Sequence, residues 1–130
     1  MLSGFKILVI EDDESIGEVI EGFLEAHHFR TTWAMDGKTG LQMARENKPS
    51  AIILDRQMPG LDGHDVLREL KADPSLAKIP VIMLTAENRR VEIEESIKLG
   101  AIDYIIKPFK PEEFVERVKK ILFAHVQKKS

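Results

Sequence analysis

The sequence predicts an α/β fold in which a parallel sheet lies between two layers of helices. Short apolar runs alternate with segments of helical periodicity, and this strand-helix pattern occurs five times along the chain. The apolar runs are continuous, which is typical of parallel strands that are covered on both faces. Parallel strands of this kind are joined by right-handed crossovers. Together these observations favour a three-layer (βα)5 sandwich.

The predicted strands are short, and each ends at a polar or charged residue. The clearest apolar runs are residues 6–10, 51–54, 80–84 and 104–106. A fifth and weaker strand, residues 30–34, is rich in Thr and Trp, so we expect it at an edge of the sheet.

The helical segments carry apolar residues three or four positions apart. Ser15 and Glu18 have the spacing of a capping box at the start of the first helix. Gly100 is expected to end the fourth helix, and Pro111 to open the fifth. The stripes are Ile16, Val19, Ile20, Phe23 and Leu24; Leu41 and Ala44; Val66, Leu67 and Leu70; Ile93 and Ile97; and Phe114, Val115, Val118, Ile121 and Leu122.

Length and composition set the class of protein. We expect one domain over residues 1–130, with its core at about 5–122 and a last helix that extends to about residue 128. The chain has no cysteine, which excludes disulfides and thiolate metal sites. Its net charge of −3 is too small to indicate direct nucleic-acid binding. No apolar run reaches the length of a membrane span and the start lacks a signal-peptide pattern, so we expect a cytoplasmic protein.

Polar groups follow the predicted strands at the edge where a parallel sheet binds ligands. The first strand leads into Glu11 and Asp12, the third into Asp55, the fourth into Thr85 and the fifth into Lys107. Mg²⁺ prefers oxygen ligands, so two or three carboxylates make a suitable partial cage. A neighbouring lysine and hydroxyl suit a phosphoryl group, whose charge must be neutralised from several sides.

Each of these residues also has an ordinary structural explanation. Asp12 and Asp13 could cap the first helix, and acids in its first turn would favour the positive end of the helix dipole. Asp55 could start a loop, Thr85 could cap a helix, and Lys107 could be a solvated surface charge. Taken together, these explanations are less convincing, because every strand end would have to supply a chemically useful group by chance.

Other phosphate-binding patterns are absent from the sequence. It has neither a G-x-x-x-x-G-K-[ST] loop nor a G-x-G-x-x-G motif, so neither kind of nucleotide site is supported. Four consecutive acids after the first strand would repel a flavin phosphate. Arg56 and Gln57 follow Asp55, so the second aspartate of a D-x-D phosphatase loop is missing.

Four stretches in this order resemble the receiver domain of two-component response regulators: ILVIEDD, AIILDRQMPGLDG, PVIMLTAE and LGAIDYIIKPF. The resemblance extends from about residue 5 to about residue 122. Thr85 and Lys107 lie 30 and 52 positions after Asp55, which fits the family pattern. The resemblance implies a flavodoxin-like fold with strand order 2-1-3-4-5.

The resemblance also implies a phosphorylation site with Mg²⁺, or Mn²⁺, as its cofactor. Asp55 would be the phosphoacceptor. Asp12 and Asp55 would bind the metal directly, Glu11 would help through water, and the backbone carbonyl of Gln57 would complete the protein ligands. Lys107 would pair with the phosphoryl oxygens. Asp13 and Glu14 are then left as helix-start residues.

Further residues would transmit or time the signal. Thr85 and Tyr104 would form a switch toward a surface made by the fourth helix, fifth strand and fifth helix, which is also a candidate homodimer surface. Gln57 and Glu87 lie at positions that adjust the phosphate lifetime in the family. Arg56 stands where relatives commonly carry an apolar residue, and we favour a solvated side chain there over an effect on the partner kinase or phosphate lifetime.

The sequence therefore predicts a phosphoacceptor regulator and not an enzyme that turns over a substrate. Its expected partners are a sensor histidine kinase or a histidine phosphotransfer protein, and an output protein or an output domain beyond this chain. One alternative is a pseudo-receiver, an interaction module that works without phosphorylation. A third hypothesis is a small flavin-dependent or metal-dependent enzyme.

Overall fold

The computed structural model describes residues 4–86 and 90–129, with side chains as far as residue 127. Its centre is a five-stranded parallel sheet of order β2-β1-β3-β4-β5. The strands are β1 (Lys6–Ile10), β2 (Arg30–Ala34), β3 (Ala51–Asp55), β4 (Val81–Thr85) and β5 (Asp103–Ile106). The predicted parallel sheet and strand order are confirmed, and β2 is an edge strand as expected.

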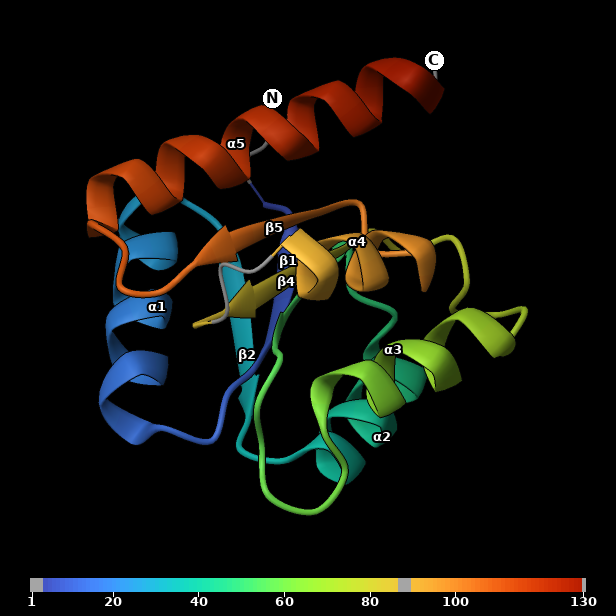
Figure 1. Ribbon diagram of the computed structural model, residues 1–130. Coiled ribbons are helices and arrows are strands. Elements are labelled where there is room, and N and C mark those ends of the chain that lie inside the picture. The colour runs from blue at the N-terminus through green and yellow to red at the C-terminus, as the bar shows by residue number, and fades with distance from the viewer. Residues whose placement is uncertain (1–3, 87–89, 130) are drawn as a thin grey trace.

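Helices cover both faces of this sheet (Figure 1). On one face lie α1 (Glu14–Ala26) and α5 (Pro111–Lys129), and on the other lie α2 (Gly37–Asn47), α3 (Gly63–Ala72) and α4 (Arg90–Lys98). This is the predicted flavodoxin-like three-layer sandwich. No helix among the described residues combines the length and the apolar character that a bilayer crossing requires.

The core consists of two apolar layers, one on each face of the sheet. Ile7 and Val9 of β1 point into the layer beneath α1 and α5, whereas Leu8 and Ile10 point into the layer beneath α2 and α3. All four side chains are buried, because alternate residues of a strand face opposite sides and both sides are covered. Double coverage explains why the strands read as continuous apolar runs.

The helix ends agree with the sequence, including Asp13 and Glu14 as helix-start residues of α1, except for one predicted capping motif. Asp13 is the N-cap of α1, and its side chain accepts a hydrogen bond from the backbone N–H of Ile16. The capping box predicted from Ser15 and Glu18 is therefore wrong, because the chain turns into the helix two residues earlier. Gly100 follows α4 with φ of 112°, a left-handed conformation that only glycine adopts easily.

Candidate functional site

Three carboxylates meet at the carboxyl edge of the sheet. Glu11 and Asp12 directly follow β1, and Asp55 ends the adjacent strand β3. One oxygen from each of the three lies within 4.8 Å of the others. Glu11 and Asp55 are buried, and Asp12 is half-buried. The fold thus brings together the acids that the sequence placed at two strand ends.

A lysine closes the site from the other side. Lys107 follows β5, and its Nζ lies 3.1 Å from Asp55 Oδ1 and 3.1 Å from Glu11 Oε1. Its backbone N–H donates to the carbonyl of Thr85 at the end of β4, at 2.7 Å. The ammonium group is therefore held at the acid cluster by the neighbouring strand.

Burial and mutual contact change the acidity of these groups. Burial raises the pKa of Glu11 from 4.5 to about 7, and the hydrogen bond with Asp55 acts in the same direction. Burial also raises the pKa of Asp55, although Glu11 and Lys107 partly offset it. For Lys107, burial favours the neutral form, but the two carboxyl groups outweigh it and the pKa lies above its ordinary value. The cluster thus favours an additional positive charge.

The site residues fit a hard divalent cation. All three offer carboxylate oxygens, the ligand type that Mg²⁺ prefers. Glu11 Oε1 is buried and forms an ion pair with Lys107, yet it has no suitably oriented hydrogen-bond donor among the described residues. Such an oxygen retains unused lone pairs that a metal ion or its water could occupy.

Trp33 holds the acidic loop in place, a role that the sequence did not reveal. Its indole Nε1–H donates to the backbone carbonyl of Glu11 at 2.9 Å, and the backbone N–H of Glu11 donates to Ala34 at 3.0 Å. Both backbone groups of Glu11 are therefore bonded to β2. The indole packs against α1 at Gly17, where an added Cβ would overlap the ring. The available signal was a large aromatic residue in an otherwise polar edge strand.

The remaining predicted residues lie at the edges of this cluster. Thr85 is buried at the end of β4, and Gln57 is exposed, with its backbone N–H 3.4 Å from Asp55 Oδ1. Tyr104 is half-buried in β5, with the guanidinium of Arg117 5.8 Å from the centre of its ring. Glu87 lies outside the described residues.

Arg56 differs from its expected solvated state. Its side chain is only 20% exposed, and it forms ion pairs with Asp62 at 3.5 Å and with Glu92 of α4 at 3.3 Å. The expectation was wrong because the acids lie six and 36 positions further along the chain, so no local pattern links them. His64 is buried at the start of α3.

Comparison with known proteins identifies the class of protein to which this fold and site belong. A family model for the response regulator receiver domain matches residues 7–119. The chain therefore belongs to the response regulator receiver domain family, whose members are signalling domains.

Two relatives show what kinds of protein carry such a domain. The chain is 41% identical over 114 residues to the DNA-binding response regulator MtrA of Mycobacterium tuberculosis, covering 88% of this chain and 49% of MtrA. It is 38% identical over 116 residues to the response regulator PleD of Caulobacter vibrioides, covering 89% of this chain and 26% of PleD. The chain thus spans about half the length of MtrA and about a quarter of PleD.

Solved structures share the fold over nearly the whole chain. The chemotaxis response regulator CheY4 of Vibrio cholerae aligns with a TM-score of 0.87 at 25% identity, covering 92% of this chain and 99% of CheY4. The receiver domain of the sensor histidine kinase PA1611 from Pseudomonas aeruginosa aligns with a TM-score of 0.83 at 32% identity, covering 92% of this chain and 98% of the PA1611 chain. The latter was solved with a magnesium ion coordinated in its active site cleft.

Proposed function

We propose that this receiver domain is a phosphoacceptor and that Asp55 takes a phosphoryl group from a phosphohistidine on a sensor histidine kinase or histidine phosphotransfer protein. One observation carries the proposal: the carboxylates of Glu11, Asp12 and Asp55 converge at one sheet edge, with the Lys107 ammonium 3.1 Å from Asp55. A nucleophilic carboxylate needs its own charge and that of the incoming phosphoryl group offset, and this cluster is suited to do so.

The transfer step balances with the groups present. A carboxylate oxygen of Asp55 bonds to phosphorus while the bond between phosphorus and the donor imidazole nitrogen breaks. The electron pair of that bond stays on the imidazole nitrogen, and Asp55 becomes an acyl phosphate. Lys107 then pairs with the phosphoryl oxygens, and the domain carries the group without turning over a substrate.

We assign Glu11, Asp12 and Asp55 as the side chains that hold Mg²⁺, or Mn²⁺, with the backbone carbonyl of Gln57 as a further ligand. The ion supplies charge neutralisation for the phosphoryl oxygens when bound. The oxygen-only donor set and the magnesium ion in the PA1611 receiver domain support this assignment.

The signal would leave the site through Thr85 and Tyr104. The Thr85 hydroxyl would hydrogen-bond the phosphoryl group, and Tyr104 would turn inward beside it, which would alter the surface formed by α4, β5 and α5. That surface exposes Val91, Ile97 and Ile106, so it suits an apolar output partner, or a second copy in a homodimer. Gln57 and Glu87 would adjust the phosphate lifetime, and a lifetime unchanged after both are replaced would remove that role.

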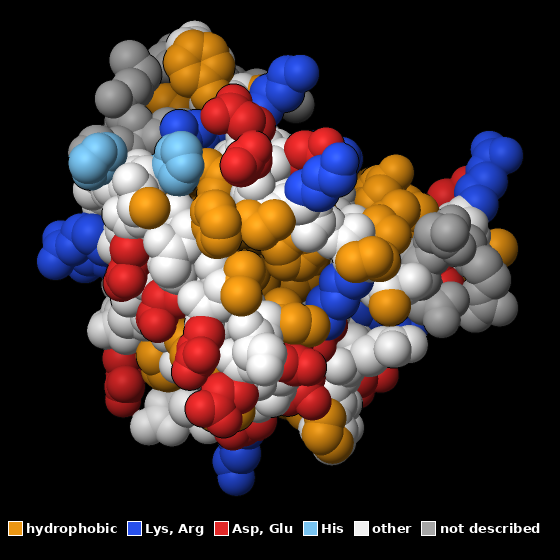
Figure 2. Space-filling model, turned by 90° about the vertical axis from the view of Figure 1, so that its left-hand side faces the viewer, with side chains coloured by type: hydrophobic (Ala, Val, Ile, Leu, Met, Phe, Trp, Pro, Cys, Tyr) orange, Lys and Arg blue, Asp and Glu red, His pale blue; other side chains and the backbone are white. Residues whose placement is uncertain are grey.

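An apolar groove next to the acceptor suits the phosphodonor protein. Hydrophobic side chains gather at the centre of the face that carries α1 and the start of α5 (Figure 2). The groove has a volume of about 480 Å³, and its lining includes Ile16, Val19, Pro108 and Phe109 beside Lys107. Because Lys107 belongs both to the groove and to the acid cluster, a partner seated there could present its phosphohistidine to Asp55.

The test is the intact mass of the chain after incubation with acetyl phosphate, with and without Mg²⁺. We expect the native chain to gain one phosphoryl group only with the metal, and Asp55→Asn to gain none. Asp13→Asn is the matched control, because Asn keeps the helix cap and Asp13 lies outside the proposed ligand set. A folded native chain that gains no mass would instead support the pseudo-receiver, which acts by binding alone.

A further inference from the structure

Helix α4 is attached to the domain by polar contacts more than by apolar burial. Ser96 is its one buried side chain, at 3% exposure. Val91 and Ile97 are 72% and 44% exposed. Of the two residues in the predicted apolar stripe, Ile93 is half-buried and Ile97 is exposed, so neither is fully buried. A helix with so little buried apolar surface depends on its other contacts for its position.

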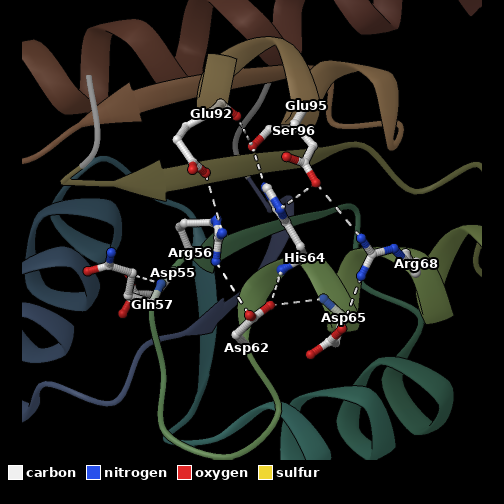
Figure 3. Close-up of polar contacts among 10 residues, drawn as sticks. All are labelled: Asp55, Arg56, Gln57, Asp62, His64, Asp65, Arg68, Glu92, Glu95 and Ser96. Atoms are coloured by element: carbon white, nitrogen blue, oxygen red, sulfur yellow. Dashed lines mark hydrogen bonds and ion pairs between the residues drawn. The ribbon is translucent and has the colours of Figure 1, made fainter. Parts of the chain in front are cut away.

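Those contacts form one network toward the start of α3, shown in Figure 3. We call it the α3–α4 network. Its members are Arg56, Asp62, His64, Asp65, Arg68, Glu92, Glu95 and Ser96.

Arg56 is the member nearest to the acceptor. It directly follows Asp55, and its backbone N–H donates to Leu84 of β4 at 2.8 Å, which fixes its backbone to the sheet. Its guanidinium joins Asp62, the N-cap of α3, to Glu92 of α4. Its Nε is buried and has no hydrogen-bond partner among the described residues, so the guanidinium retains an unused donor.

The second link is a buried hydrogen bond between His64 and Ser96. His64 Nε2 lies 2.8 Å from Ser96 Oγ, and this hydroxyl donates to the Glu92 carbonyl one turn earlier in α4, at 3.2 Å. Glu95 lies 3.7 Å from His64 Nδ1 and 3.9 Å from Arg68 at the rim of the network.

Phosphorylation would add charge next to this network. An acyl phosphate on Asp55 brings up to about two negative charges to the residue adjacent to Arg56. That anion would compete with Glu92 for the guanidinium, whose buried Nε–H has no acceptor among the described residues. Loss of the Arg56–Glu92 pair would remove one of the contacts that hold α4 to the start of α3.

We propose that Arg56 is a positioning residue that couples Asp55 to α4, and that the Arg56–Glu92 pair favours the unphosphorylated arrangement of this helix. The inference rests on the proposed function, because it takes Asp55 as the acceptor. By linkage, any change that breaks the pair also makes the phosphorylated state easier to reach.

The first measurement is hydrogen exchange of residues 90–98 in the full chain with Mg²⁺, before and after addition of beryllofluoride as a phosphoryl mimic. We expect Glu92→Gln to raise exchange in the mimic-free protein and to bind the mimic several-fold more tightly. Glu94→Gln is the matched control, because the ion pair that Glu94 forms with Arg90 lies entirely within α4. Equal exchange and equal mimic affinity in the two variants would overturn the proposal.

A double-mutant cycle separates coupling from a local effect of Arg56. If Arg56 acts through Glu92, then Glu92→Gln changes the mimic affinity of the native chain but not that of Arg56→Gln, so Arg56→Gln and the double variant bind the mimic with similar affinity. If Arg56 acts only as a charge near Asp55, the two effects add, and the proposal fails.

The two proposals fail in different ways. Failure of the phosphoacceptor function appears as a native chain that neither gains mass nor binds beryllofluoride, and the coupling then fails with it. Normal phosphorylation that is indifferent to Glu92→Gln would overturn the coupling alone.

Discussion

At the scale of single residues, Trp33 explains how a run of acids is kept in one place. Neighbouring carboxylates repel one another, so the loop after β1 would relax outward without restraint. The indole N–H on the Glu11 carbonyl, with the backbone bond from Glu11 to Ala34, opposes that movement. We therefore treat Trp33 as a positioning residue for the proposed metal site.

Trp33→Phe should weaken Mg²⁺ binding about fivefold, because the loss of one hydrogen bond costs about 1 kcal/mol. Isothermal titration calorimetry measures this affinity. Phe29→Leu is the control. It also removes core volume next to β2, but Phe29 precedes the first residue of this strand, whereas the acids of the site lie beyond its last residue. An equal loss of affinity in both variants would mean that Trp33 acts through stability alone.

His64 gives a second prediction at the residue scale. Burial and the charge of Arg56 lower the pKa of His64, while Glu95, Asp62 and Glu92 act in the opposite direction. The folded state thus favours neutral His64, so its contribution to stability is complete above pH 6.5 and decreases as the pH falls below that value. Arg56→Gln should raise the pKa, as measured by NMR titration of the imidazole. Arg90→Gln, on the exposed side of α4, should leave it unchanged.

At the scale of elements, α1 contains two glycines whose surroundings differ. A Cβ at Gly17 would overlap the Trp33 ring, so α1 and β2 approach closely only because that residue lacks a side chain. A Cβ at Gly22 would meet nothing within 4 Å. The closeness of α1 to β2 at Gly17 is therefore part of how the acidic loop is positioned.

These glycines should respond to alanine in opposite ways. Gly22→Ala should stabilise the fold by about 0.5–1 kcal/mol, because alanine is the better helix former. Gly17→Ala should destabilise it by about 1–3 kcal/mol, because the indole must move. Urea denaturation measures both changes. A Gly17→Ala protein as stable as Gly22→Ala would show that the ring has room to shift.

At the scale of the whole molecule, the buried acid cluster links folding to pH. The pKa of Glu11 is raised from 4.5 to about 7. A group with a raised pKa contributes stability that is complete below the unfolded value and is lost as the pH rises through the folded value. The burial of Asp55 acts with the same sign. The metal-free protein should therefore lose stability between about pH 4.5 and pH 7.

We expect this loss to be on the order of 2–3 kcal/mol in EDTA, and saturating Mg²⁺ at pH 8 to recover stability by binding the native state. Chemical denaturation at several pH values measures it. Glu11→Gln should remove most of the pH dependence while keeping the shape of the side chain. A wild-type profile parallel to that of Glu11→Gln would contradict the assigned burial of charge.

The sequence by itself determined the layers of this protein, the order of its elements and the residues at its strand ends. Continuous apolar runs indicate strands that are covered on both faces. Parallel strands end at the same edge of a sheet, which brings together Glu11, Asp12, Asp55 and Lys107. Only the tertiary structure decided the partners of Trp33, Arg56 and His64. Their contacts join β2 to the loop after β1, and both the loop after β3 and α3 to α4, across 22 to 36 positions of chain, through polar groups that follow no periodic pattern. Periodicity predicts which face of an element is buried, whereas a hydrogen bond or ion pair between elements depends on packing that exists only in the folded chain.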